Sequence, residues 1–100
     1  MRILVIEDDP SVADFVSGGL REAGHTVDHA DHGKDGLVLA TTETNDARIV
    51  ARRLPGVDGL SVVRTLRASD NDTPVIILSA LGQVDDRVKG LQAGGDDYLT

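Results

Sequence analysis

The fold is decided by Arg2–Asp9, which reads RILVIEDD. Four consecutive apolar residues, Ile3–Ile6, three of them β-branched, are typical of a strand that is buried on both faces, as in a parallel sheet. Three carboxylates follow at once, from Glu7, Asp8 and Asp9. Because ligands of an open α/β sheet bind at the carboxyl ends of its strands, we expect a functional site at this point.

Three adjacent carboxylates repel one another, so they are best tolerated in water or around a cation. Mg²⁺ prefers hard oxygen ligands and is often held by one or two carboxylates with waters and phosphate. Glu7 and Asp8, with Asp9 beside them, are therefore a candidate Mg²⁺ site. The alternative is an acidic turn that only caps the next helix.

The composition limits the classes of protein that fit. One hundred residues make one domain, and Phe15 and Tyr98 are its only aromatic residues, so the core must consist of Val, Leu, Ile and Ala. The net charge of −7 argues against direct binding of nucleic acid. Arg2 is followed by too few apolar residues for a signal peptide, no stretch reaches the length of a membrane span, and there is no cysteine; a cytoplasmic protein is expected.

Strand-like and helix-like segments alternate along the rest of the chain. We expect further strands at residues 25–30, 47–51, 74–78 and 96–100, and helices at residues 10–23, 35–42, 60–67 and 85–93. This alternation predicts an α/β fold, a doubly wound parallel sheet of the flavodoxin-like kind. Residues 44–54 taken alone are also compatible with a short helix ended by Pro55, but the surrounding elements favour a strand.

The first helix has a clear start and a weak middle. Pro10 suits its first turn and Ser11 could cap it, while apolar residues recur at helical spacing from Val12 onward. Those residues are Val12, Phe15, Val16, Leu20 and Ala23. Gly18 and Gly19 weaken the helix by about 1 kcal/mol each relative to Ala.

Four stretches of the chain form a recognisable set. They are RILVIEDDPSVADFVSGGLREAGHTVDHADHGKDGL from Arg2, LPGVDGL from Leu54, TPVIILSA from Thr73 and DRVKGLQAGGDDYLT from Asp86. Together they resemble response-regulator receiver domains, most closely those of the OmpR/PhoB subfamily. The resemblance implies a CheY-like fold with strand order 2-1-3-4-5 and Mg²⁺-dependent transfer of a phosphoryl group from a histidine kinase to an aspartate. It also implies a DNA-binding effector domain as partner.

The resemblance assigns roles to single residues. Asp8 would be a direct Mg²⁺ ligand and Glu7 would act largely through water, with Asp9 as a neighbour. Ser79 matches the hydroxyl residue that contacts the phosphoryl group, and Tyr98 the aromatic residue that turns inward when the domain switches.

The family's phosphoacceptor aspartate is replaced by Ala51, whose methyl group can neither attack phosphorus nor bind a cation. Asp46 lies five residues earlier, about 16 Å along an extended strand, at the wrong end of the sheet. Asp58 belongs to the following loop. We therefore predict a receiver that cannot be phosphorylated, that has no catalytic residue, and that binds Mg²⁺ weakly or not at all.

Two residues near this position are also unusual. Arg48 stands in the middle of a strand that should be buried on both faces, so its guanidinium should reach either an acid or solvent. Asn45 stands where the subfamily often has an aromatic residue.

The family continues after Tyr98 with a Lys-Pro pair and a fifth helix, whereas the printed sequence ends at Thr100. We expect residues 1–100 to be a truncated receiver domain without its last helix or a DNA-binding domain. One sheet face should then be open, which predicts a homodimer or higher oligomer. Exchange of elements across the loop at Pro55 and Gly56 is one route to it.

His29 and His32, with Asp28 and Asp31 nearby, could in principle bind a transition metal, but solvated surface histidines are the better interpretation, as for His25. Two other function classes are possible for such a sequence. A small Mg²⁺-dependent hydrolase would need a base for which no residue is positioned, and a non-signalling scaffold would use the fold only for protein contacts.

Overall fold

The computed structural model describes residues 1–69, 71–79 and 84–99. Its strands are β1 (Arg2–Ile6), β2 (Thr26–Ala30), β3 (Ala47–Ala51), β4 (Val75–Leu78) and β5 (Asp97–Leu99). Its helices are α1 (Pro10–Glu22), α2 (Gly33–Thr42), α3 (Gly59–Ala68) and α4 (Val84–Gln92). The strands form one parallel sheet in the order β2-β1-β3-β4-β5, which confirms the predicted fold.

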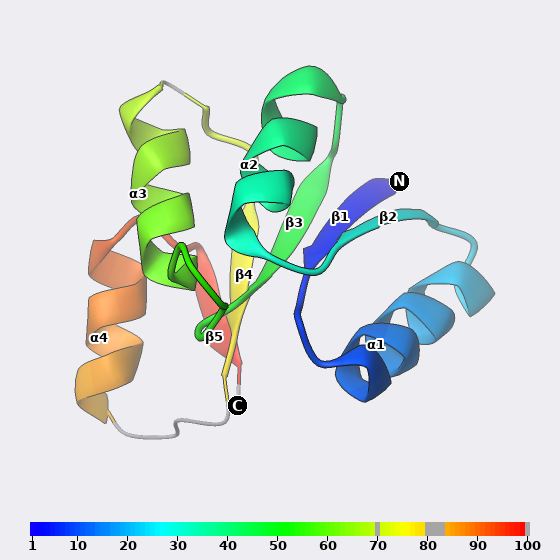
Figure 1. The fold of residues 1–100 in the computed structure, drawn as a ribbon, viewed down its shortest axis with the longest axis horizontal. Helices are drawn as coiled ribbons and strands as arrows, with labels where there is room; N and C mark the ends of the chain where they lie inside the picture. Colours follow the sequence, from blue (N-terminus) through cyan, green and yellow to red (C-terminus); the bar gives the residue numbers. More distant parts are fainter. Residues whose placement is uncertain (70, 80–83, 100) are drawn as a thin grey trace.

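The helices form two layers around the sheet (Figure 1). α1 covers β1 and β2 from one side, and α2, α3 and α4 lie on the other. The larger core cluster lies under α2–α4 and includes Leu4, Ile6 and Tyr98. The smaller one lies under α1 and is formed by Ile3, Val5 and Val27. Both faces of β1 are therefore buried, as its unbroken apolar run predicts.

β3 is a strand, and the helical alternative for residues 44–54 is excluded. Its register places Ile49 between Val5 of β1 and Ile76 of β4. Two parallel neighbours fix this segment, and they override a local sequence that a helix would also accept. Ala51 is thereby set at the carboxyl end of β3, opposite Leu78.

α1 begins differently from the expectation. Its N-cap is Asp9, whose Oδ1 accepts hydrogen bonds from the backbone N–H of Ser11 at 2.9 Å and of Val12 at 3.3 Å. Ser11 is therefore not the N-cap. Its backbone N–H is one of the donors that the side chain of Asp9, one position before Pro10, already satisfies.

The side of α1 that faces the sheet also differs from the expectation. Phe15 is 83% exposed, while the buried residues of the helix are Ala13 and Ser17. With 3.6 residues per turn, Phe15 lies on the opposite side of the helix from these two. The apolar spacing therefore predicts the helix but does not show that Phe15 lies on its outer face.

Arg48 contradicts the prediction that its guanidinium finds an acid or reaches solvent. It is 2% exposed. Its acceptors are neutral: Oδ1 of Asn45 at 2.8 Å, Oδ1 of Asn71 at 2.7 Å, and the carbonyl of Ala40 at 2.9 Å. Burial, with Arg67 as a second cause, lowers the pKa of Arg48 below its ordinary value. Three well-placed neutral acceptors compensate the guanidinium where an acid or solvent was expected.

Candidate functional site

The carboxyl ends of β1, β3 and β4 meet at a cavity of about 380 Å³. Its lining residues are Glu7, Asp8, Asp9, Ala51, Arg52, Arg53, Leu78 and Ser79. Five residues that the sequence singled out are thus brought together by three strands that are distant along the chain. Tyr98 does not line this cavity, because its side chain lies in the larger core cluster.

Glu7 and Asp8 make this cavity acidic. Glu7 is half-buried and Asp8 is exposed. Burial raises the pKa of the Glu7 carboxyl, the neighbouring Asp8 charge raises it further, and a hydrogen bond from the backbone of Asp9 partly opposes the rise. A cation in the cavity would relieve this repulsion.

Asp9 is partly withdrawn from the cavity by its role in α1. The same carboxylate that lines the cavity caps the helix through Ser11 and Val12. The alternative interpretation of the acidic turn, as a helix cap, therefore applies to Asp9. Glu7 and Asp8 remain as the carboxylates that could hold a metal ion.

Ala51 is buried at the end of β3, and α3 begins close against it. A Cβ added to Gly59 would lie 1.9 Å from the carbonyl oxygen of Ala51. Asp46 cannot replace an acid here, since its Oδ2 accepts a hydrogen bond from the backbone N–H of Arg2 at the amino edge of the sheet. Asp58 is bound to Arg52 by contacts of 2.9 and 3.0 Å.

Two positively charged side chains that line the cavity were not predicted from the sequence. Arg52 and Arg53 directly follow Ala51 and line the same cavity. The signal was available, because residues adjacent to a strand end share its edge of the sheet. Arg52 also forms an ion pair with Asp58. The cavity is therefore lined by positively as well as negatively charged side chains.

Ser79 and Tyr98 flank the end of β4 in different ways. Ser79 is buried and its backbone N–H donates to the carbonyl of Leu99 at 2.8 Å. Tyr98 is 1% exposed, in the inward position, and a Cβ added to Gly90 would lie 2.6 Å from its ring. Tyr98 is therefore a core residue, although it stands on the edge strand β5. The switch roles of Ser79 and Tyr98 stay predictions.

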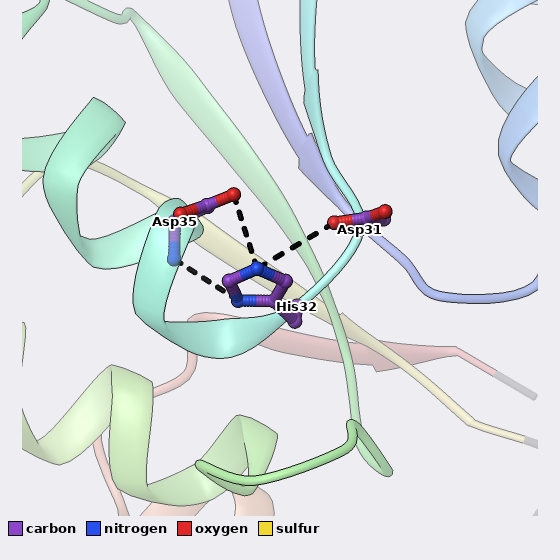
Figure 2. A group of neighbouring side chains, drawn as sticks. All are labelled: Asp31, His32 and Asp35. Carbon is purple, nitrogen blue, oxygen red and sulfur yellow. Dashed lines mark hydrogen bonds and ion pairs between the residues drawn. The ribbon is translucent and has the colours of Figure 1, made fainter.

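Among the described residues, Asp31, His32 and Asp35 place possible metal ligands within 4.8 Å of one another (Figure 2). His32 is the N-cap of α2, and its Nδ1 accepts a hydrogen bond from the backbone N–H of Asp35 at 3.3 Å. Nε2 then carries the proton and lies 3.1 Å from Oδ2 of Asp35 and 3.8 Å from Oδ1 of Asp31. A metal on Nε2 would displace this proton, so the arrangement fits a capped helix.

The other two histidines make contacts at the surface. His29 Nε2 lies 2.8 Å from the carbonyl of Glu7, and His25 Nδ1 lies 3.2 Å from the N-terminal amine. No described helix is long and apolar enough to cross a membrane.

Comparison with known proteins agrees with the family resemblance seen in the sequence. The family model described as "Response regulator receiver domain" matches residues 3–100. The chain is 48% identical over 99 residues to the probable transcriptional regulatory protein SilR of Salmonella typhimurium, covering 99% of this chain and 43% of that protein. It is 49% identical over 98 residues to the transcriptional regulatory protein PrrA of Mycobacterium tuberculosis, covering 98% of this chain and 42% of that protein. The chain thus spans less than half the length of these relatives.

Solved structures agree with the fold. The receiver domain of the Francisella response regulator 1452 superposes with a TM-score of 0.96 at 38% identity, over 99% of this chain and 82% of that one. The receiver domain of the sensor histidine kinase PA1611 from Pseudomonas aeruginosa PAO1 gives a TM-score of 0.91 at 36% identity, over 99% and 83%. The latter was solved with a magnesium ion coordinated in its active-site cleft.

Proposed function

We propose that this chain, which belongs to the response regulator receiver domain family, is the receiver part of an OmpR/PhoB-like transcription regulator that cannot be phosphorylated at the family site. The observation that carries the proposal is Ala51 at the carboxyl end of β3, on the cavity that Glu7, Asp8 and Ser79 also line. A methyl group stands where the family carries its phosphoacceptor. The direct test is whether acetyl phosphate with Mg²⁺ adds a phosphoryl group to the protein.

Neither Asp46 nor Asp58 is placed to replace the missing aspartate. Asp46 is held at the opposite edge of the sheet by Arg2, and Asp58 is held by Arg52. The chain therefore acts through binding, and we assign it no enzymatic step. In a longer protein its partners would be a histidine kinase and a DNA-binding effector domain, in the cytoplasm.

The residues present fit a weakly held Mg²⁺. Glu7 and Asp8 offer the one or two carboxylates that this ion takes in proteins, and waters would complete its shell. When bound, the ion would neutralise the charge of these carboxylates. Ala51 adds no ligand, and Arg52 and Arg53 bring positive charge to the same cavity, so we expect weak binding.

A titration with Mg²⁺, followed by backbone amide shifts, tests this second part of the proposal. The Ala51→Asp variant is the matched control, since it restores the third carboxylate and should bind the ion more tightly. Tight binding by the unaltered protein, centred on Asp8, would contradict the expectation.

We also propose that the chain associates with a second copy. The sheet face that α1 shares carries partly exposed apolar side chains on β3 and β4, from Ile49, Ile76 and Leu78, and Leu99 of β5 is 49% exposed. Exposed apolar surface of this kind marks contact sites. Light scattering coupled to size exclusion measures the mass directly, and a monodisperse monomer at high concentration would overturn this part.

A further inference from the structure

We propose that an extended segment of a partner protein, with a basic and an apolar side chain two residues apart, docks in the groove between β2 and α2. The groove has a volume of about 460 Å³, and its lining residues are His29, Ala30, Asp31, Asp35, Val38 and Leu39. It lies at the β2 edge of the sheet and shares no lining residue with the cavity at Ala51, so the inference does not rest on the function proposed above.

Two carboxylates give the groove a negative charge. Asp31 and Asp35 are exposed, and their side chains point toward Nε2 of the same His32 ring (Figure 2). That ring is neutral when its Nδ1 accepts the hydrogen bond that caps α2, so its contact of 3.1 Å with Asp35 leaves the charge of both carboxylates in place. Lys34 is exposed but does not line the groove. In the described part of the chain, the arginines pair with other acids, namely Asp28, Glu43, Asp58 and Asp96.

The apolar part of the groove is carried by α2. Val38 is 52% exposed, and Leu39 beside it is half-buried. Val38 comes three residues after Asp35, so the apolar and the acidic side chain are neighbours on one helix face, with Cβ atoms about 5–6 Å apart. An occupant of the groove therefore needs an apolar group and a positive charge at about that spacing.

The outer edge of β2 supplies backbone partners for such an occupant. β2 is the first strand of the sheet, so only one of its sides pairs with another strand. The carbonyl of Ala30 accepts a hydrogen bond of 3.0 Å from the backbone N–H of Glu7, so the backbone groups of Ala30 face β1. Because these groups alternate along a strand, the N–H and the carbonyl of His29 face the other way, beside the groove.

The other half of this edge is already covered. The backbone of Val27 also faces outward, and its carbonyl accepts a hydrogen bond of 3.3 Å from Nη2 of Arg21 on α1. A charged side chain over a strand edge is one way in which proteins protect it from further pairing. Within the residues that the structure describes, the backbone of His29 has no such side-chain partner. An extended segment can therefore pair with β2 at His29, next to the groove.

These features together select the occupant. A segment that adds to a sheet edge gains backbone hydrogen bonds, and its alternate side chains enter pockets on one face. Residues two apart along a strand are separated by about 7 Å, close to the spacing of Asp35 and Val38 on α2. A lysine or arginine would lie between Asp31 and Asp35, while an apolar side chain two residues away lies on Val38. The net charge of −7 attracts a basic segment from a distance.

A titration with a designed peptide tests the groove. The probe is a capped heptapeptide of alternating arginine and valine, and the readout is the backbone amide shifts of the protein. We expect shifts concentrated at residues 29–31 and 35–39 and a Kd below about 1 mM. A peptide of alternating glutamate and valine loses the charge, and one of alternating arginine and serine loses the apolar side chains. Each should bind about tenfold more weakly.

Variants of the protein test the two parts of the groove separately. The pair Asp31→Asn and Asp35→Asn removes its charge, and Val38→Ser removes its apolar side chain. Each variant should raise the Kd of the arginine–valine peptide by about tenfold. All three residues are exposed, so these changes should leave the fold intact.

Matched controls lie on α1. The pair Asp14→Asn and Glu22→Gln removes two exposed charges, and Phe15→Ser removes an exposed apolar side chain. These variants should change the Kd by no more than about twofold. A peptide that fails to bind, that shifts the residues around Ala51 or on α1 instead, or that binds equally to groove and control variants would overturn the proposal. Equal shifts with arginine amide alone would overturn it in favour of a small cationic ligand.

Discussion

Nη1 of Arg48 donates a hydrogen bond of 2.7 Å to Oδ1 of Asn71, which ties the middle of β3 to the segment between α3 and β4. Arg67 contacts the same residue, since its Nη1 donates a hydrogen bond of 2.8 Å to the backbone carbonyl of Asn71. Two guanidinium groups thus converge on one asparagine, away from the cavity at the carboxyl edge of the sheet. This buried polar network fixes β3, and with it the position of Ala51.

Removing the Arg48 side chain should be strongly destabilising. Arg48→Ala leaves a cavity and deprives Asn45, Asn71 and Ala40 of their donor, so we expect a loss of about 3 kcal/mol in the free energy of unfolding. Urea unfolding measures it. Arg64→Ala, at an exposed arginine of α3, is the control and should change stability by no more than about 0.5 kcal/mol. Equal effects of the two variants would show that the network contributes little.

Two glycines should respond oppositely to the same substitution. In Gly59→Ala the new Cβ would collide with the Ala51 carbonyl, a backbone atom that cannot move aside alone, so we expect a loss of more than about 2 kcal/mol. In Gly18→Ala the new Cβ meets open space and the helix gains about 0.5–1 kcal/mol. Thermal melts of the two variants, at a concentration where the protein is monomeric, should shift in opposite directions.

Substitutions of Asp9 and Asp8 should distinguish the residue that caps α1 from the residue that binds the metal ion. Asp9→Ala removes the cap of α1 and should cost about 1 kcal/mol of stability. Asp8→Asn should leave stability within about 0.5 kcal/mol and weaken Mg²⁺ binding further. The paired measurement is urea unfolding with a Mg²⁺ titration for each variant. Loss of Mg²⁺ binding in Asp9→Ala alone would reverse these roles.

Much of the fold was predictable because the sequence and the packing agree. The apolar run of β1 is buried on both faces, and the carboxylates after it do line the cavity with Ala51 and Ser79. The first follows because helices cover both faces of a parallel sheet, and the second because parallel strands end at the same edge of the sheet.

The sequence-based predictions failed where a side chain has several possible contact partners. A local pattern leaves open whether Asp9 or Ser11 caps α1, and it does not say that Phe15 lies on the outer face of the helix. Arg48 was expected to reach an acid or solvent, but it is buried and its acceptors come from segments 3, 8 and 23 residues away. Such partners are fixed only by the tertiary structure.

Glu7 should make stability depend on pH in a defined direction. Its pKa in the folded protein is raised above the ordinary 4.5, so the fold favours the neutral carboxyl and the charged form costs stability. Glu7→Gln should therefore be more stable than the unaltered protein at neutral pH. The difference should shrink as pH falls through the raised pKa and vanish below 4.5, where the carboxyl is protonated in both states.

Urea unfolding of both proteins at several pH values measures this difference. Asp72→Asn, at an exposed carboxylate far from the cavity, is the control for a general effect of charge. A gap between Glu7→Gln and the unaltered protein that widens toward acid pH would contradict the expected sign.

The central claim is that Ala51 leaves this receiver without a phosphoacceptor, and intact-mass spectrometry after incubation with acetyl phosphate and Mg²⁺ tests it most directly. We predict an unchanged mass under conditions that phosphorylate a receiver of the same family carrying the aspartate. A stoichiometric phosphoryl adduct, labile in hydroxylamine as an acyl phosphate is, would contradict the account.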